Sequence, residues 1–309
     1  GIYLKPQNLP TVQNHSFSQA RALHGLPSHS QKTARWNLWA KKSCSSFWKS
    51  PQNRTNRMKI LCVSDQIDPL IYNQNAHKNF PDIDLILCAG DLPMDYVDFI
   101  VSVFNKPTYF IFGNHDLKEF KYYHGTMSAP PRPTTSAQST TSIEIHFESI
   151  KEDHHHGANY AGFKNIRLKN FKIRNRRGKT TPLLLTGISG SIRYNNGLCQ
   201  YSDAEMAMHL LGLVPRLLLN KILYGRFTDI FLTHSAPYKI HDHDDPCHRG
   251  FKSFNLFLKL FKPEYMIHGH IHLYDNREER VSKYEDTTII NAFAHYILEF
   301  NTDKNGVQK

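Results

Sequence analysis

Five short apolar runs constrain the fold most, because each has the length of one buried strand and ends in residues that can bind metal ions. The runs are KILCVSD, DLILCAGD, PTYFIFGNHD, TDIFLTHSAP and EYMIHGHIH, which begin at residues 59, 84, 107, 228 and 264. Residues 95–104, DYVDFIVSVF, have helical spacing between the second and third runs. Strands and helices that alternate at short intervals are typical of a layered α/β fold.

Polar side chains follow each of these runs directly. The carboxyl ends of strands in a layered α/β sheet share one rim, so the side chains should meet there. Carboxylate, carboxamide and imidazole groups together suit manganese, iron or zinc better than calcium, and the absence of thiolates argues against a structural zinc site. The predicted metal ligands are Asp65, Asp91, Asn114, His234, His270 and His272.

These ligands are too many for a single ion. Two divalent ions that share a bridging carboxylate would use them all, lower the pKa of a bound water and clamp a phosphoryl group. His115 is not needed as a ligand, and it is therefore the predicted proton donor to a leaving alkoxide. Asp116, its neighbour, is predicted to fix the tautomer of that histidine.

The motifs VSD, CAGD, FGNHD, LTHSAP and HGHIH, in this order, resemble those of the calcineurin-like metallophosphoesterase superfamily over about residues 58–300. The segments GISGSIRYNNG and IHDHDDPCHRGF are similar to a bacterial and archaeal branch of it. The resemblance implies a four-layer α/β/β/α sandwich with a dinuclear centre between its sheets. It also implies a metal-dependent phosphoesterase that cleaves a phosphomonoester or phosphodiester by attack of a metal-bound hydroxide.

The resemblance further implies a division of labour among the ligands. The first metal ion would be held by Asp65, Asp91 and His272, with Asp91 bridging. The second would be held by Asn114, His234 and His270, and His115 would assist the leaving group.

One position departs from the family pattern. The first motif of the family is usually Asp-x-His, and Ile67 stands where that histidine belongs. Water would fill the gap, or Asp68 on the same loop would swing in; either change weakens the first site or retunes it toward a harder ion. The alternative function is therefore a degenerate interaction scaffold with weak or no catalysis, although the other intact ligands argue for an enzyme.

Further polar residues are candidates for substrate contact or for support of the ligands. Arg193 follows the GISGS turn and is predicted either to bind a substrate phosphate or to form a surface salt bridge. A dense polar segment after the His234 strand contributes His241, Asp245 and His248. His268 alternates away from the ligands and is predicted to be a supporting or core residue, and His154–His156 are predicted to be a solvated run.

The net charge of +11 is concentrated at the start of the chain. Residues 1–57 hold nine of the 38 Lys and Arg residues and no acid, which leaves 29 basic against 27 acidic residues elsewhere. We expect a basic leader that is disordered, a transit peptide, a nucleic-acid-binding arm, or sequence upstream of a start at Met58. Nucleic acid is therefore an expected partner only through this leader; otherwise the partner is a small phosphate ester.

Five scattered cysteines without a CxxC pair indicate a reducing compartment, and we expect a cytoplasmic protein. The apolar stretch 206–225 is broken by His209, Pro215, Arg216 and Lys221, so we expect a helix or helix pair and no membrane span.

The predicted organisation is a leader at 1–57, a metallophosphoesterase domain at 58–302 and a tail at 303–309. Residues 118–158 form a Pro/Ser/Thr-rich loop or lid, and this loop and residues 236–250 are expected to set substrate specificity. A helix is expected over 203–223, with Asp203 as its cap.

Overall fold

The structure, a computed structural model, describes residues 56–115, 117–124, 157–174, 178–275 and 278–303. The chain divides into two units, Gly1–Arg54 and Thr55–Lys309, and all described residues belong to the second. Nearly all of the predicted leader and tail, most of the predicted lid and the run His154–His156 lie outside the described residues. The predicted domain boundaries therefore stay predictions.

Two mixed β-sheets form the centre of the second unit. The first sheet has the order β13 (Ala294–Asn301), β1 (Arg57–Ser64), β2 (Ile83–Cys88), β3 (Thr108–Phe110) and β4 (Asn159–Tyr160). The second has the order β11 (Val281–Tyr284), β12 (Thr287–Asn291), β10 (Tyr265–His268), β9 (Ile230–Thr233), β6 (Thr180–Ile188) and β5 (Lys164–Arg174). Two short strands, β7 (Ser191–Ile192) and β8 (Gln200–Tyr201), pair with each other.

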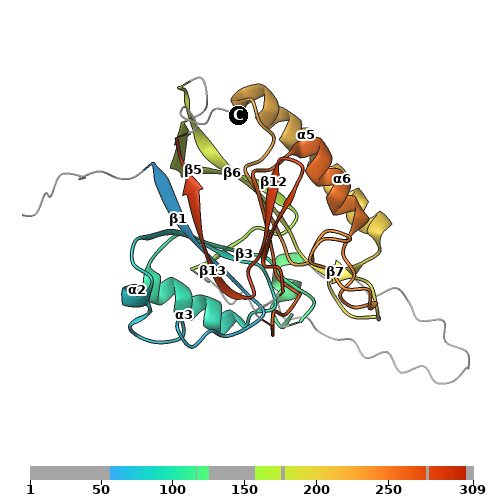
Figure 1. The fold of residues 1–309 in the computed structure, drawn as a ribbon, viewed down its shortest axis with the longest axis horizontal. Helices are drawn as coiled ribbons and strands as arrows, with labels where there is room; N and C mark the ends of the chain where they lie inside the picture. The colour runs from blue at the N-terminus through green and yellow to red at the C-terminus, as the bar shows by residue number, and fades with distance from the viewer. Residues whose placement is uncertain (1–55, 116, 125–156, 175–177, 276–277, 304–309) are drawn as a thin grey trace, which may run out of the picture. The chain divides into compact units, whose positions relative to one another are not determined.

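The helices cover the outer faces of the two sheets. Figure 1 shows α2 and α3 along one outer side and α5 and α6 along the other. The described helices are α2 (Ala76–Asn79), α3 (Met94–Phe104), α4 (Phe120–His124), α5 (Asp203–Tyr224) and α6 (Lys252–Phe261).

Alternate residues of each central strand enter different cores, as the two-residue period of a strand requires. In β1, Ile60 and Cys62 belong to the core between the sheets, whereas Leu61 and Val63 pack in the core that includes α3. Both faces of β1 are thus buried, which explains why its sequence is continuously apolar.

The second sheet is arranged in the same way. Leu232 of β9 enters the core between the sheets, and its neighbour Phe231 packs against residues of α5 and α6, including Leu217 and Phe257. The layers are therefore helix, sheet, sheet and helix, and the predicted four-layer α/β/β/α sandwich is confirmed.

The prediction that Asp203 caps α5 is wrong by one residue. Ser202 is the N-cap: its hydroxyl accepts from the backbone N–H of Glu205, and the Glu205 carboxylate accepts from the backbone N–H of Ser202. This reciprocal pair is a capping box, and it leaves Asp203 as the first helical residue. The helix then continues unbroken through Pro215.

Candidate metal centre

Parallel strands of both sheets bring the predicted ligands to adjoining rims. The strands β1, β2 and β3 are parallel, as are β6, β9, β10 and β12, so their carboxyl ends lie together in each sheet. The oxygen ligands Asp65, Asp91 and Asn114 follow strands of the first sheet. The histidines His234, His270 and His272 follow strands of the second, and the site therefore straddles the two sheets.

Three of these residues adopt left-handed backbone conformations that residues other than glycine rarely occupy. The φ angles are 65° for Asp65, 52° for Asp91 and 67° for His270. Such conformations cost about 1–3 kcal/mol each and persist where surrounding contacts enforce them. Here the backbone N–H of His270 donates to both carboxylate oxygens of Asp65, at 2.9 Å each, which ties the two loop ends together across the sheets.

Two glycines in the GNHD and GHIH motifs are required by close packing around the carboxylates. A Cβ atom on Gly113 would lie 2.0 Å from Oδ1 of Asp91, and one on Gly269 would lie 2.3 Å from Oδ2 of Asp65. Neither distance is tolerable, so any other residue at these positions would displace a predicted ligand.

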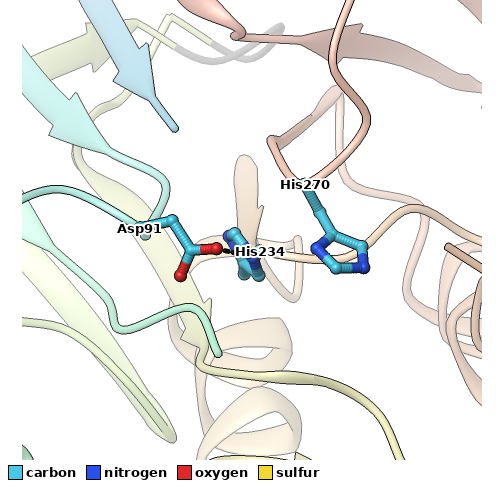
Figure 2. Close-up of side chains that lie close together, drawn as sticks. All are labelled: Asp91, His234 and His270. Atoms are coloured by element: carbon cyan, nitrogen blue, oxygen red, sulfur yellow. Dashed lines mark ion pairs between the residues drawn. The ribbon is translucent and has the colours of Figure 1, made fainter. Parts of the chain in front are cut away.

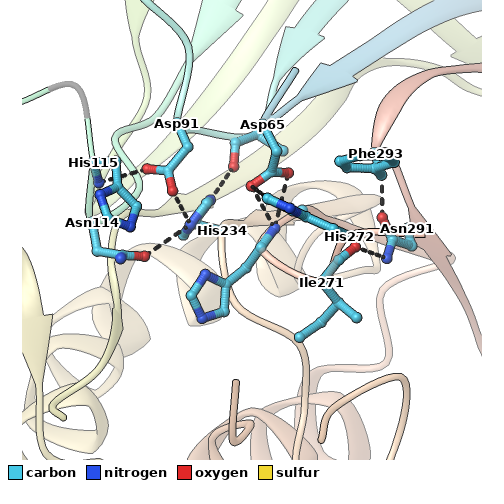
Figure 3. Close-up of polar contacts among 12 residues, drawn as sticks. Asp65, Asp91, Asn114, His115, His234, Ile271, His272, Asn291 and Phe293 are labelled. Carbon is cyan, nitrogen blue, oxygen red and sulfur yellow. Dashed lines mark hydrogen bonds and ion pairs between the residues drawn. The ribbon is translucent and has the colours of Figure 1, made fainter. Parts of the chain in front are cut away.

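His234 lies at the middle of the site and is fully buried. Its Nε2 atom is 3.2 Å from Oδ2 of Asp91 and 3.2 Å from Oδ1 of Asn114 (Figure 3). Its Nδ1 atom lies 2.9 Å from the carbonyl oxygen of Ala89, which can only accept. Nδ1 therefore carries a hydrogen, and Nε2 is the atom that faces the two oxygen ligands.

Asp91 and His234 shift each other's pKa because they lie in contact. Burial alone would raise the pKa of Asp91, but the charge and hydrogen bond of His234 outweigh it and leave the pKa below its ordinary value. Burial alone would lower the pKa of His234, but the Asp91 charge raises it to about 9. A divalent cation bound among these atoms would displace a proton from Nε2, because a ligating imidazole must be neutral.

His270 completes a compact set of three ligands. Asp91, His234 and His270 each offer one ligand atom, and these atoms all lie within 4.8 Å of one another (Figure 2). Nε2 of His270 donates to the carbonyl oxygen of Cys247 at 2.7 Å, which leaves Nδ1 as the ring's acceptor. Burial lowers the pKa of His270 to about 3, which keeps the imidazole neutral as a metal ligand must be.

The part of the site around Asp65 is less compact. Nε2 of His272 lies 3.9 Å from Oδ1 of Asp65, and its Nδ1 lies 2.6 Å from the hydroxyl of Tyr274. The side chain of His272 is 41% exposed. Burial raises the pKa of Asp65, against the opposing charge of His234.

Ile67 and Asp68 do not complete this part of the site. Ile67 is exposed. The Asp68 carboxylate pairs with Nδ1 of His295 on β13 and accepts from the backbone N–H of Leu70 at 2.8 Å. The expectation that Asp68 would swing in to replace the missing imidazole therefore has no support in the contacts that this carboxylate makes.

Asp116 lies outside the described residues, whereas His115 is described and lies at the rim of the site. Its backbone N–H donates to Oδ1 of Asp91 at 2.7 Å, and the residue is exposed. The predicted partnership of His115 with Asp116 thus stays a prediction.

Of the other candidates, Arg193 and His241 contact residues that are not ligands, whereas His248 lies beside the ligand His270. Arg193 forms an ion pair with Glu205 at 2.8 Å, so it contacts the start of α5 instead of the ligands. Nδ1 of His241 lies 2.9 Å from Nε2 of the buried His268, which supports the strand behind His270. His248 lies beside the site, with its ring centroid 5.3 Å from that of His270 and its Nδ1 3.0 Å from Asp245.

Three supporting contacts were not predicted from the sequence. Two are the backbone carbonyls of Ala89 and Cys247, which fix the rings of His234 and His270. Because every residue has a carbonyl, the residue type gives no sign of such a contact. The third is the Tyr194 hydroxyl, which accepts from Nδ2 of Asn114 at 3.2 Å and so turns Oδ1 toward His234. The GISGSIRY segment contains this tyrosine, but its sequence signal pointed to the neighbouring arginine.

Comparison with known proteins decides the family. The model of the calcineurin-like phosphoesterase family matches residues 58–274, which is more than half of the chain. The chain belongs to the calcineurin-like phosphoesterase family. Members of this family are metal-dependent hydrolases of phosphate esters, and the family resemblance inferred from the motifs is confirmed.

Three solved structures are similar to this chain at low sequence identity. One crystal structure matches with a TM-score of 0.51 at 11% identity, over 79% of this chain and 95% of that chain. TT1561 of Thermus thermophilus matches with a TM-score of 0.48 at 14% identity, over 80% and 99%. Vacuolar Protein Sorting 29 from Cryptosporidium parvum matches with a TM-score of 0.31 at 12% identity, over 76% and 74%. No curated protein matches the chain.

Proposed function

We propose that this protein hydrolyses a small phosphate monoester or diester with the help of two divalent metal ions, one held more tightly than the other. The observation that carries the proposal is the group of Asp91, His234 and His270, whose ligand atoms lie within 4.8 Å of one another at the meeting point of two sheets. A structural core has no physical need for a carboxylate and two imidazoles in contact.

In this proposal the tighter site, which we name the Asn114 site, is held by Asn114, His234 and His270 together with Asp91. The looser site, the Asp65 site, is held by Asp65 and His272 and shares Asp91. When bound, the divalent ions would supply an activated water and neutralise charge on the phosphoryl group. Manganese, iron and zinc suit this donor set.

His115 is the proposed acid for the leaving group. Its backbone is anchored to Asp91 while its exposed ring is free to face a substrate at the rim. An imidazole beside the metal ligands could deliver a proton to the leaving alkoxide as the phosphorus–oxygen bond breaks. His248, on the loop 236–250, is the proposed rim contact for the substrate, since its ring lies close to that of His270.

The test is turnover of p-nitrophenyl phosphate and its bis-ester with added Mn²⁺. Asn114→Ala and His115→Ala should each lower kcat/KM by roughly a hundredfold or more, because they remove a ligand and an acid. Matched controls are Asn170→Ala and His77→Ala, which change exposed residues of β5 and α2. Wild-type turnover by Asn114→Ala and His115→Ala would defeat the assignment.

One observation favours a second candidate function, an interaction scaffold that has lost catalysis. Ile67 stands where the family motif has a histidine, and no described side chain replaces that imidazole. Elemental analysis separates the two functions: stoichiometric metal in the purified protein supports the enzyme, whereas a protein that takes up none supports the scaffold.

We also propose that the protein works in a reducing compartment, the cytoplasm. All four described cysteines, Cys62, Cys88, Cys199 and Cys247, are free, and three of them are buried, which supports this proposal.

A further inference from the structure

Helix α5 has two apolar faces, of which only one is used in the fold. Met206, Leu210, Leu213 and Leu217 are buried against the second sheet. The opposite stripe consists of Met208, Leu211, Leu218, Leu219, Ile222 and Leu223, whose exposures range from 44% to 79%. These six residues recur at spacings of three, four and seven, so they share one side of the helix.

Helix α6 has exposed apolar residues as well. α5 and α6 contact each other on the same outer side of the molecule (Figure 1). Leu256 and Leu260 of α6 are exposed at 57% and 55%. We name these two residues and the six of α5 the outer apolar face. Exposed apolar residues gathered on one side of a molecule mark a site of contact with a protein or a membrane.

Most of the charge along α5 and α6 is positive; the exceptions are Asp203 and Glu205 at the start of α5 and Asp286, which pairs with Lys262 after α6. Residues 206–227 and 246–263 contain no Asp or Glu. The exposed cations Arg216, Lys221 and Lys259 form no ion pair with any described acidic side chain. A surface with apolar residues in the middle and unopposed cations around it is complementary to an anionic partner that also has an apolar phase.

The cations lie on both flanks of the α5 stripe. On one flank, Lys221 lies over the ring of Phe227, which packs against Phe261 of α6. On the other flank, Arg216 and Leu219 line an open groove of about 460 Å³ between α5 and β5. Lys164 and Arg167 of β5 line the same groove, so three cations surround a space that is large enough for a phosphate group.

We propose that the outer apolar face docks on an anionic phospholipid membrane, with headgroup phosphates in the groove lined by Lys164, Arg167 and Arg216. α5 is long and apolar enough to rank as a candidate membrane span, but the residues of its inner face are packed against the second sheet. The helix therefore lies on the bilayer with its outer stripe among the acyl chains and does not cross it. A second copy of the chain is disfavoured as the occupant, because a symmetric contact would oppose like charges. This inference does not depend on the proposed catalysis.

The test is flotation of the full chain with vesicles of phosphatidylcholine, with or without phosphatidylglycerol. The protein should float with the anionic vesicles and bind the neutral ones roughly tenfold less tightly or worse, since about fivefold in affinity is expected per basic residue at the surface. Leu218→Gln with Ile222→Gln, and separately Arg216→Glu with Lys221→Glu, should each weaken the binding by about tenfold or more.

Matched controls separate this face from the basic residues 1–57. Lys78→Glu with Lys106→Glu makes the same charge change at exposed positions of the first sheet's side, and Leu70→Gln with Val281→Gln makes the same apolar change elsewhere. All variants should keep the wild-type thermal midpoint, because they replace exposed residues.

Three results would overturn the proposal. One is the absence of binding to either kind of vesicle. Another is equal binding by the wild type and the α5 variants, which would assign the binding to the leader. The third is a concentration-dependent dimer that Leu218→Gln with Ile222→Gln abolishes, which would make a second copy the occupant.

Discussion

The two halves of the candidate metal centre differ in how firmly their ligands are held in place. Around His234, each ring nitrogen has a fixed partner, and Asn114 is held in place by Tyr194. Around Asp65, by contrast, His272 is half exposed and 3.9 Å away, and Ile67 provides no ligand. Because preorganised ligands bind metal more tightly than loosely held ones, the comparison predicts unequal affinities for the two ions.

The largest effect should come from the residue that joins the two halves. Asp91→Asn removes the charge that both ions would share, and it should lower turnover of p-nitrophenyl phosphate by about a thousandfold or more. Asp82→Asn is a matched control, because Asp82 precedes the same strand β2 at its other end and also has a positive φ. If the two variants are equally active, Asp91 is not shared by the two sites.

Restoring the missing imidazole should bring the affinities for the two metal ions closer together. Ile67→His should tighten the weaker of two Mn²⁺ binding events by roughly tenfold and leave the stronger one unchanged, as measured by titration calorimetry. Ile67→Ala is the control for loss of the apolar side chain. A change confined to the stronger event would mean that the two halves have been assigned the wrong way round.

The sequence predicted the fold and the convergence of the ligands because both follow from local patterns. Strand-length apolar runs such as 60–63 report burial on both faces, and parallel strands force their carboxyl ends together. The motif resemblance added the layer order. The Ser202 cap could also have been predicted from the sequence, since a serine three residues before Glu205 is the signature of a capping box.

The partner of Asp68 could not be predicted in this way. His295 lies 227 residues further along the chain and meets Asp68 only because β13 pairs with β1. The same holds for the carbonyl of Cys247, since every residue has a carbonyl and only tertiary structure decides which one faces His270. The left-handed backbone conformation of His270 could not be predicted either, because the residue type histidine does not determine the φ angle.

Asp68 provides a test in which stability and metal binding separate. Asp68→Asn should leave Mn²⁺ stoichiometry unchanged and lower the free energy of unfolding by about 1–3 kcal/mol, because the pair between the buried Asp68 and the partly buried His295 is broken. Chemical denaturation and elemental analysis measure the two quantities on one preparation. Loss of one metal equivalent would instead make Asp68 a ligand of the Asp65 site.

The smallest effect is expected at Arg193, the candidate that the structure leads away from the ligands. Arg193→Ala removes an exposed ion pair with Glu205 and should change kcat/KM by less than about twofold and stability by at most about 1 kcal/mol. A rise in KM of about tenfold, with kcat preserved, would return Arg193 to the role of a phosphate contact.

Anomalous scattering from crystals soaked in Mn²⁺ tests the central claim most directly, because it locates each ion. We expect a strong peak among Asp91, Asn114, His234 and His270 and a second, weaker peak between Asp91, Asp65 and His272. Crystals of active protein that show no peak within ligand distance of Asp91 and His234 would contradict the account.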